Sequence, residues 1–568
     1  MLLLFMIRGY DEMEDKSVNN DMITVTFKNG IKHRYKKGTS YYDISKDNHD
    51  VVEIIGVKVN NELFSLTDKV SHDVNVEFID VTDVSGYKMY QAGLKFLLEV
   101  AVKETIPNSE VYFKHSVPKG VLAEVKCDRT LLEKEFLDIK SKMRDLVRED
   151  HRIYKYNVYK KEAVSYYEEQ GYYEKAKNIH NLNSNVVAFY KLKDLFNYFY
   201  VEMPYSTAAL RRFDLEFLGD NRFVIVIPSV RTNGRVPEYI NYPNIIDSFY
   251  SGAKWLEQMK MPYVSDINDL VANGGIKDFI LASEIVYNNS ISKLADKVVN
   301  NRNIKFVLIA GPSSSGKTTT TKRLSTYFTA KGFDPICLST DDYYLDIDKI
   351  PLNKDGEKDF EALEALDLEE FNSDLKKLLI GESIDNKKYD FVLGKRFLSG
   401  TKTVLKENGI VLIEGLHCLN EELSKQISSD NKYKVYLSPF IPLNIDRHNY
   451  ISTVDLRLLR RIARDNRSRG KGVCDTIEMW QQVRNGEEKY IFPYISQANV
   501  VLNTAMAYEL GVLKVFVNPL LYSVEANSPY YEEARRLINF LSSFYEIPSE
   551  LIHNFSVIRE FIGGGIVE

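Results

Sequence analysis

The run from Gly311 to Thr318 has the composition and spacing of a phosphate-binding turn. It follows the apolar stretch 306–310 and precedes a segment that can open a helix. The backbone N–H groups of such a turn converge on a phosphate, and the helix N-terminus adds a favourable dipole. Lys317 would reach the β- and γ-phosphates, and the Thr318 hydroxyl would ligate Mg²⁺. The prediction is a nucleotide-phosphate site, with a surface Ser/Gly linker as the alternative; the residues predicted to hold the nucleotide are Gly311, Pro312, Ser313, Ser314, Ser315, Gly316, Lys317, Thr318 and Thr319.

Three carboxylates follow this loop at the ends of two apolar stretches. Glu414 ends the stretch 411–413, and Asp341 and Asp342 follow a second one. Ligands bind at the carboxyl edge of a parallel sheet, so Glu414 is predicted to hold or orient Mg²⁺ with Thr318. Transfer of a phosphoryl group to a hydroxyl needs a carboxylate that accepts or orients the proton, and Asp341 is the first choice, Asp342 the second. The alternatives are a solvent-facing acid at a strand end and an Asp pair that stabilises a turn.

The segment 457–471 is strongly basic. Its arginines recur at three- and four-residue steps, so several share one helical face, where like charges repel. Because this does not favour the helix, we predict a lid that clamps phosphate through guanidinium forks. A solvated basic face or an RNA patch is the alternative. Asp465 is the one acid among seven cations, Arg457, Arg460, Arg461, Arg464, Arg467, Arg469 and Lys471.

The elements that position these residues belong to a chain of several domains, since 568 residues exceed one ordinary domain. Strand-like alternation begins at Met22, where translation is expected to start as an alternative to Met1, and helices are predicted over 90–104 and 131–170. A further helix is predicted from Tyr530 to about Gly563. The predicted organisation is a disordered leader (1–21), a small β unit (22–82), an α+β region (83–263), a helical connector (264–303), an α/β region with a parallel sheet (304–510) and a C-terminal helical extension (511–568).

Composition indicates a soluble cytoplasmic protein. The net charge of -6 gives no whole-chain argument for nucleic-acid binding, so DNA is not an expected partner. The four cysteines lack metal-type spacing, and no apolar run reaches membrane length, so no membrane contact is expected.

The loop, the acids and the basic segment, in this order, resemble the uridine kinase and phosphoribulokinase branch of P-loop kinases over about 304–505. The family pattern S-x-D-x-F-Y falls on 339–344, its sugar-side acid on Glu361, its Y-D-F element on 389–391 and its arginine lid on 460–471. The resemblance implies ATP as phosphate donor and Mg²⁺ as cofactor. It implies catalytic roles for Asp341, Lys317, Arg464 and Arg469, nucleotide contacts from Arg461 and Lys471, substrate contacts from Asp341, Tyr344, Glu361, Tyr389, Arg464 and Arg469, and metal contacts from Thr318 and Glu414.

The departures from the family pattern fall on base recognition. Gly394 stands where pyrimidine-specific members have a histidine, and Met479 stands where they have a glutamine. A site without such hydrogen-bonding partners discriminates poorly between bases. The base, and the choice between ribose and deoxyribose, therefore stay open.

The front half has its own resemblance. Residues 22–82 look like a TGS domain of the β-grasp type, and 83–263 are similar to the editing domain of threonyl-tRNA synthetases. The two histidine positions of the editing helix hold Ala92 and Phe96, and a later C-x-x-x-H element falls on Val201 and Tyr205. Alanine, phenylalanine and valine neither ligate a metal nor move a proton, so editing hydrolysis by this route is expected to be absent.

The sequence thus predicts a multidomain α/β and α+β protein with a C-terminal P-loop kinase domain, a TGS-like β-grasp domain and an editing-like domain. The predicted activity is ATP-dependent phosphorylation of the 5′-hydroxyl of a nucleoside. Two alternatives remain: an RNA- or ribosome-associated ATP-binding regulator that uses the TGS-like region, and a kinase of another small hydroxylated metabolite. The oligomeric state and the ligand of 22–263, RNA included, stay open.

Overall fold

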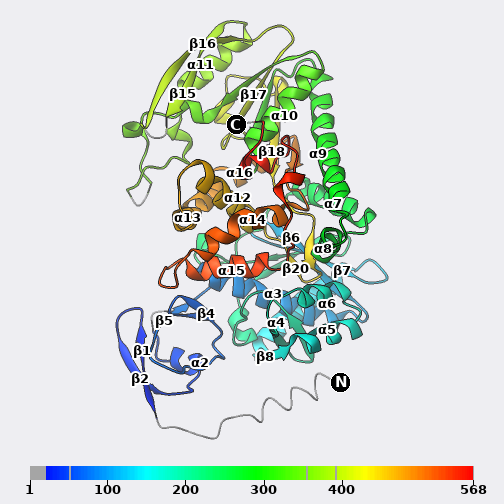
Figure 1. Cartoon of the computed structure of the whole chain (residues 1–568), viewed down its shortest axis with the longest axis vertical. Helices are drawn as coiled ribbons and strands as arrows, with labels where there is room; N and C mark the ends of the chain where they lie inside the picture. Colours follow the sequence, from blue (N-terminus) through cyan, green and yellow to red (C-terminus); the bar gives the residue numbers. More distant parts are fainter. Residues whose placement is uncertain (1–20, 50, 52, 354–355, 391–392, 567–568) are drawn as a thin grey trace.

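The computed structural model describes residues 21–49, 51, 53–353, 356–390 and 393–566. The predicted leader (1–21) lies outside the described residues except for Asp21. Phe391 also lies outside them. The chain builds a small sheet, then an α+β part, then an α/β part, and its C-terminal segment turns back onto the α/β part (Figure 1). No helix among the described residues combines the length and apolar character needed to cross a membrane.

The first part is a five-stranded sheet with strand order β2-β1-β5-β3-β4. Strands β1 and β5 pair in parallel and the other neighbours pair antiparallel. Alternating residues such as Val25, Val57 and Val76 fill one core, which explains the period-two pattern of the sequence. Its elements are β1 (Met22–Phe27), β2 (Lys32–Lys36), α2 (Tyr41–Ser45), β3 (Gly56–Val59), β4 (Glu62–Phe64) and β5 (Val74–Ile79).

The second part packs the long helix α3 against two antiparallel sheets, β11-β12-β7-β6 and β10-β9-β8. The Asp83 side chain caps α3 by accepting from the amides of Ser85 and Gly86. The elements are α3 (Val84–Thr105), β6 (Glu110–Val117), β7 (Gly120–Lys126), α4 (Glu133–Glu149), β8 (Tyr154–Tyr159), α5 (Lys160–Glu169), α6 (Tyr173–His180), β9 (Val186–Leu192), β10 (Leu195–Tyr198), β11 (Asp214–Gly219), β12 (Arg222–Val226) and α7 (Pro243–Gln258).

The predicted helix over 131–170 is wrong as a single element. Helix α4 ends at Glu149, the following Asp150 has a left-handed φ of 53°, and residues 154–159 form strand β8. Strand β8 pairs with β9 along its whole length. Tyrosine and valine favour a pleated, half-buried surface, and this tertiary pairing overrides the helix-forming charged residues nearby.

Helices α8 (Val264–Ala272) and α9 (Ile276–Val299) lead into a parallel sheet of order β14-β17-β13-β18-β21. All four neighbouring pairs of this sheet are parallel, as the alternation of strands and helices predicted. The elements are β13 (Phe306–Ala310), α10 (Lys317–Ala330), β14 (Asp334–Ser339), α11 (Leu368–Leu379), β15 (Ser383–Asp390), β16 (Lys395–Val404), β17 (Gly409–Gly415), β18 (Lys432–Ser438), β19 (Asn444–Asp446), β20 (Asn449–Tyr450), α12 (Thr453–Ser468), α13 (Val473–Tyr490), β21 (Val500–Asn503) and α14 (Glu509–Tyr522).

The central strand β13 is buried on both faces. Val307 and Ile309 pack into a core that includes residues of α9 and α10. Phe306, Leu308 and Ala310 face a second core shared with α7 and α11. Helices therefore cover both sides of the sheet, which explains why β13 reads as a continuous apolar run.

The hairpin of β19 and β20 joins the α/β part to the α+β part. Asn444 donates its side-chain amide to the carbonyl of Phe113 at 2.9 Å, and the amide of Phe113 donates to the carbonyl of Arg447 at 2.9 Å. The Arg447 guanidinium pairs with Glu174 at 2.6 Å in a buried position. Buried, hydrogen-bonded contacts of this kind hold the two parts in a defined relation.

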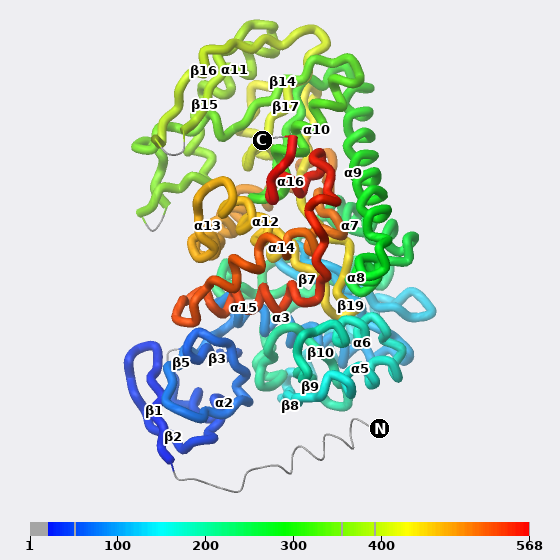
Figure 2. Tube along the Cα trace, viewed as in Figure 1, coloured from blue at the N-terminus to red at the C-terminus, as the bar shows by residue number. Residues whose placement is uncertain are grey.

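The C-terminal segment runs back over the α/β part. Helix α15 (Tyr531–Leu541) is followed by an irregular stretch and the short helix α16 (Arg559–Ile562), which lies in the same region as α10 and β18 (Figures 1 and 2). The predicted single helix from Tyr530 to Gly563 is therefore wrong. Helix α15 ends at Leu541, and Pro548, which lacks a backbone N–H and disfavours helical geometry at the residue before it, opposes a helix that runs on through this stretch.

Candidate active site

The phosphate loop connects β13 to the N-terminus of α10. Ser314 and Gly316 have left-handed φ values of 60° and 84°. Such conformations turn successive backbone N–H groups toward one concave point, which suits an anion. The Lys317 ammonium donates to the carbonyls of Gly311 (2.9 Å) and Pro312 (3.3 Å), so it lies across the loop.

The loop is closely packed at Gly311 and contains hydroxyls without a partner in the described part of the chain. A Cβ atom on Gly311 would lie 2.6 Å from the Ser315 hydroxyl oxygen and 2.8 Å from the carbonyl oxygen of Leu437. The hydroxyls of Ser314 and Ser315 are buried and have no protein hydrogen-bond partner among the described residues. Buried polar groups normally have a partner, so these hydroxyls are consistent with a bound ligand.

Thr318 and Glu414 form an oxygen-rich pair next to the loop. The Thr318 hydroxyl donates to the two carboxylate oxygens of Glu414 at 3.1 and 3.3 Å. Burial raises the pKa of Glu414 to about 7, although the nearby Lys317 charge opposes the shift. Hydroxyl and carboxylate oxygens are ligands that Mg²⁺ prefers, so the residues present fit this metal.

Asp341 lies on a single 3₁₀ turn (Thr340–Tyr343) that follows β14, one strand away from Glu414. The approach is close because the edge residue Gly415 has no side chain: a Cβ there would meet the Thr340 hydroxyl at 1.9 Å. Asp341 is exposed at the surface, yet surrounding protein partly withdraws its carboxylate from bulk water and raises its pKa. The charges of Lys317 and Arg469 counteract this shift, which places both cations near Asp341.

Asp342 has a different environment from Asp341. Its carboxylate pairs with the Lys388 ammonium of β15 at 2.8 Å. This contact supports Asp341 rather than Asp342 as the group available to an acceptor.

The predicted sugar-side residues lie near Asp341: they are Tyr344, Glu361 and Tyr389. The Tyr344 hydroxyl donates to the carbonyl of Phe360 at 2.9 Å, and the Tyr344 and Tyr389 rings lie 5.5 Å apart between centroids. Burial raises the pKa of Glu361 to about 7, against the opposing charges of Lys317 and Arg461. The predicted substrate residues therefore share one electrostatic environment with the phosphate loop.

The structure shows the surroundings of the two positions that depart from the family pattern, Gly394 and Met479. Gly394 has a φ of 63°, and a Cβ there would lie 2.8 Å from that of Ile347, so a histidine does not fit without rearrangement. Met479 contacts Lys471, whose ammonium lies 3.1 Å from the Met479 sulfur. Neither position offers a side chain that reads a pyrimidine edge.

The expectation that the arginines of α12 are unfavourable for stability is wrong for Arg457 and Arg460. Arg457 forms a bidentate pair with Glu487 of α13 and donates from Nε to the carbonyl of Ser313 at 2.8 Å. Arg460 is fully buried, pairs with the fully buried Glu509 at 2.6 Å and donates to the Ser314 carbonyl at 3.2 Å. These two arginines brace the phosphate loop from behind, and acids distant in the sequence neutralise them.

The rest of the basic segment is organised by one acid. The buried carboxylate of Asp465 accepts from Arg461 and Arg464 at 3.1 Å and lies 3.6 Å from Arg469. Arg461 also donates to the Ser313 hydroxyl at 3.1 Å. One acid among three guanidinium groups leaves a positive surplus close to the phosphate loop.

Glu560 of α16 was not anticipated from the sequence. Its carboxylate accepts from the backbone amide of Thr319 at 3.0 Å, in the first turn of α10. Its charge also contributes to the raised pKa of Glu414. A carboxylate at a helix N-terminus takes a position that suits a phosphate oxygen. No local motif marks a single glutamate in the C-terminal extension, so only the fold reveals it.

The residues aligned with the editing motif lie in the α+β part. Ala92 and Val201 line a cavity, whereas Phe96 is buried in the core beside Phe199. Tyr205 stacks on Tyr42 of helix α2 in the first part, with ring centroids 3.9 Å apart. Among the described residues, no group of three or more His, Cys, Asp or Glu side chains is arranged to hold a metal ion.

Residues 306–509 match the model of the phosphoribulokinase / uridine kinase family. A uridine kinase of Anoxybacillus flavithermus is 27% identical over 212 residues, which cover 36% of this chain and 91% of that protein. A uridine kinase of Deinococcus deserti is 29% identical over 199 residues, which cover 35% of this chain and 86% of that protein. A solved structure described as a possible uridine kinase from Bacillus stearothermophilus is 18% identical with a TM-score of 0.26, covering 38% of this chain and 98% of that one.

A threonine–tRNA ligase of Caldanaerobacter subterraneus subsp. tengcongensis is 24% identical over 172 residues, or 30% of this chain. The chain spans only about a quarter (27%) of that relative's length. Both resemblances inferred from the motifs are thus confirmed: residues 306–509 resemble the phosphoribulokinase / uridine kinase family, and the N-terminal part of the chain is similar to threonine–tRNA ligases.

Proposed function

We propose that the chain is an ATP- and Mg²⁺-dependent kinase that phosphorylates the 5′-hydroxyl of a nucleoside. The observation that carries this proposal is the meeting of Lys317, Asp341 and Glu361 in one site, where the Lys317 charge lowers the pKa of both carboxyl groups and the Asp341 charge raises that of Glu361. The phosphate loop supplies the donor side and Glu361 with Tyr344 supplies the sugar side. An acceptor hydroxyl between them would lie within reach of Asp341.

The chain's own residues define the steps. The loop amides and Lys317 bind the phosphate chain, and Thr318 with Glu414 would hold Mg²⁺, which neutralises charge on phosphate oxygens when it is bound. Asp341 accepts or orients the hydroxyl proton, so that the acceptor oxygen forms its bond to the γ-phosphorus as the bond from that phosphorus to the β-phosphate oxygen breaks. Arg464 and Arg469 are assigned to the charge on the transferring group, and Arg461 and Lys471 to the nucleotide.

The direct test is an ADP-release assay over ribo- and deoxyribonucleosides, with phosphorylated sugars as controls. Turnover with nucleosides and not with sugar phosphates supports the proposal. Measurable ATP binding without turnover on any acceptor would replace it with the ATP-binding regulator. Turnover on a sugar phosphate alone would move the acceptor to another hydroxylated metabolite.

The pH dependence of acceptor binding should report on Glu361. Burial raises its pKa to about 7, so the carboxylate gains charge as the pH rises through that value. An ionised carboxylate accepts hydrogen bonds from sugar hydroxyls, and the nucleoside KM should therefore fall up to about tenfold between about pH 6 and about pH 8. Steady-state kinetics at saturating ATP measure this slope. Glu361→Gln should flatten it, and an unchanged slope in that variant would separate Glu361 from acceptor binding.

Removal of the Glu560 carboxylate should tighten nucleotide binding. A nucleotide that uses the Thr319 amide must displace Glu560, and loss of that charge-assisted bond should lower the ATP dissociation constant by about tenfold. Isothermal titration of Glu560→Ala against wild type measures the change. Glu550→Ala, at an exposed position before α16, is the matched control. Weaker ATP binding in Glu560→Ala would mean that the carboxylate helps to hold the nucleotide.

A further inference from the structure

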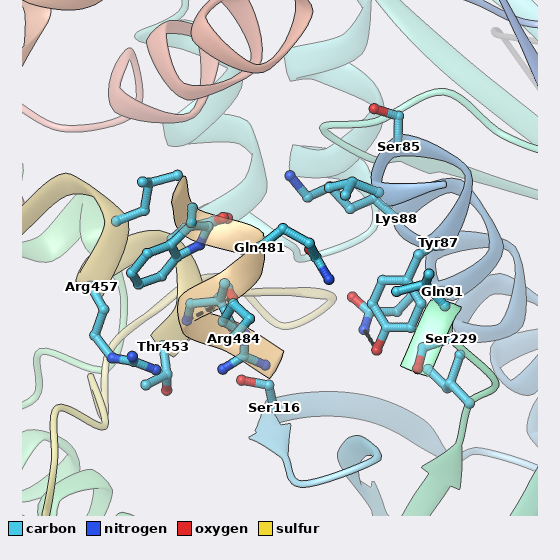
Figure 3. A pocket seen from close by; sticks show the side chains of 18 of the residues that line it. Ser85, Tyr87, Lys88, Gln91, Ser116, Ser229, Thr453, Arg457, Gln481 and Arg484 are labelled. Carbon is cyan, nitrogen blue, oxygen red and sulfur yellow. Dashed lines mark hydrogen bonds between the residues drawn. The ribbon is translucent and has the colours of Figure 1, made fainter. Parts of the chain in front are cut away.

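The cavity lined by Ala92 and Val201 lies behind the phosphate loop, between the α+β part and the α/β part. Its volume is about 620 Å³, which is within the range of small-molecule sites. Helix α3 and strand β6 form one side of it, and α12, α13 and α15 form the other (Figure 3). Pro312 of the phosphate loop also contributes to the wall, but Lys317, Asp341 and Glu361 do not. The cavity is therefore separate from the candidate active site.

Much of the cavity wall is aromatic or aliphatic. Trp480 of α13 is buried, lines the cavity and has no hydrogen-bond partner for its indole N–H among the described residues. A buried indole N–H normally donates to a partner. The other large apolar side chains of the wall include Tyr87, Tyr436, Phe440, Phe492 and Ile477.

Most cations around the cavity have a carboxylate partner of their own. Lys58 pairs with Asp83 at 2.7 Å, and Arg231 pairs with Glu488 at 3.2 Å. Lys88 and Arg536 share the two carboxylates of Asp455 and Glu533. The charges of these cations are neutralised by carboxylates of the protein, so they are not available to pair with a ligand.

Arg457 and Arg484 are different, because they share the single carboxylate of Glu487. Arg457 takes both oxygens of Glu487, and Arg484 donates one N–H to it at 2.7 Å. In the described part of the chain, no protein acceptor is assigned to the other N–H groups of Arg484. Burial and the nearby Arg231 lower the pKa of Arg484 to about 10, although the charge of Glu488 opposes the shift.

Arg484 and Trp480 both line the cavity and lie one helical turn apart on α13. Figure 3 shows the Arg484 guanidinium between Ser116 and Gln481, with Tyr87 on the opposite side of the space. A guanidinium fork, an indole N–H and an apolar wall together resemble the donor set that binds an acid with a hydrophobic body.

We propose that this cavity binds a small organic monocarboxylate, with its carboxylate on Arg484 and the Trp480 indole and its aromatic or aliphatic body against the apolar wall. The two arginines exceed Glu487 by one charge, which matches a carboxylate and falls short of a phosphomonoester, with a charge of about -1.5 to -2 at neutral pH. Such a ligand completes the hydrogen bonds of both donors and balances the buried charge. The site is a binding site only, and its existence does not depend on the proposed nucleoside kinase activity.

The test uses the full-length protein and a fluorescent aromatic monoanion, 1-anilinonaphthalene-8-sulfonate, as the probe. Wild type should bind it saturably at one site, and phenylacetate, an aromatic monocarboxylate, should displace it. Arg484→Met should weaken binding by about tenfold or more, since a charge-assisted bond is lost. This variant keeps the Arg457–Glu487 pair and should remain folded.

Two further variants make the result specific. Ser116→Trp places a large ring in the cavity and should abolish binding of the probe, while Arg148→Gln, on the exposed face of α4, should leave binding unchanged. Thermal melts check that each variant is folded. Saturable binding that survives both Arg484→Met and Ser116→Trp would place the probe elsewhere and overturn the proposal, as would the absence of saturable binding to wild type or of its displacement by phenylacetate.

Discussion

Replacement of Asp341 by Asn should lower kcat for phosphoryl transfer by about 10²- to 10⁴-fold, the usual contribution of a positioned acid or base. The amide keeps the size of the side chain and can still contact the acceptor hydroxyl. It does not accept that proton at neutral pH. The loss should therefore appear in kcat at saturating substrates.

ATP binding should survive the same replacement. The phosphate loop and Lys317 hold the nucleotide, and Asp341 contributes only a like charge near the phosphates. The ATP dissociation constant of Asp341→Asn should lie within about threefold of wild type, less than 1 kcal/mol. Single-turnover kinetics combined with calorimetry separate the two quantities.

Asp342→Asn is the matched control for this prediction. Asp342 is paired with Lys388 and lies one residue from Asp341 on the same turn. Its replacement should cost far less activity than that of Asp341. Full activity in Asp341→Asn, or a larger loss in Asp342→Asn, would transfer the catalytic role away from Asp341.

Arg460→Met should destabilise the protein by about 3–5 kcal/mol, because it leaves the buried Glu509 carboxylate without its partner. Arg460 and Glu509 are both fully buried, and burial already raises the pKa of Glu509. The substitution also removes the donor to the Ser314 carbonyl, so the phosphate loop loses a support. Urea denaturation followed by circular dichroism measures the stability change.

The double variant Arg460→Met/Glu509→Met distinguishes an ion pair from a phosphate-clamping role. Two apolar side chains of similar size remove the uncompensated charge, so much of the lost stability should return. Arg148→Gln breaks an exposed ion pair and should change stability by less than about 1 kcal/mol. If the Arg460→Met protein were as stable as wild type but defective in turnover, Arg460 would have a phosphate-clamping role and not a structural one.

Local sequence was sufficient to predict an element wherever the residues of one short segment explain its structure. The apolar run 306–310 predicts a buried strand, and the glycines at 311 and 316 predict the turn that follows it. The alternation before Asn29 predicts a half-buried strand. The fold class and the presence of Thr318, Asp341 and Glu414 at one sheet edge follow from this logic, because parallel strands all present their carboxyl ends on the same side.

Partners distant in the sequence could not be predicted in this way. The basic segment 457–471 contains one acid, but Glu487 and Glu509 from other helices pair with Arg457 and Arg460 and offset the repulsion between the arginines. Residues 154–159 are flanked by helix-forming segments, and only their pairing with β9 makes them a strand. Both errors have the same origin: burial and pairing are set by surfaces that meet only in the folded chain.

The predicted chemistry of the phosphate loop follows from local sequence, because the proposed roles of Lys317 and Thr318 depend on spacing within a few residues. The folded structure sets which charged groups have partners. It balances Arg457 and Arg460 with acids from other helices, directs Glu560 to the Thr319 amide and leaves Arg484 with surplus charge in a separate cavity. Electrostatic interactions depend on distance and burial, and neither quantity follows from local order along the chain.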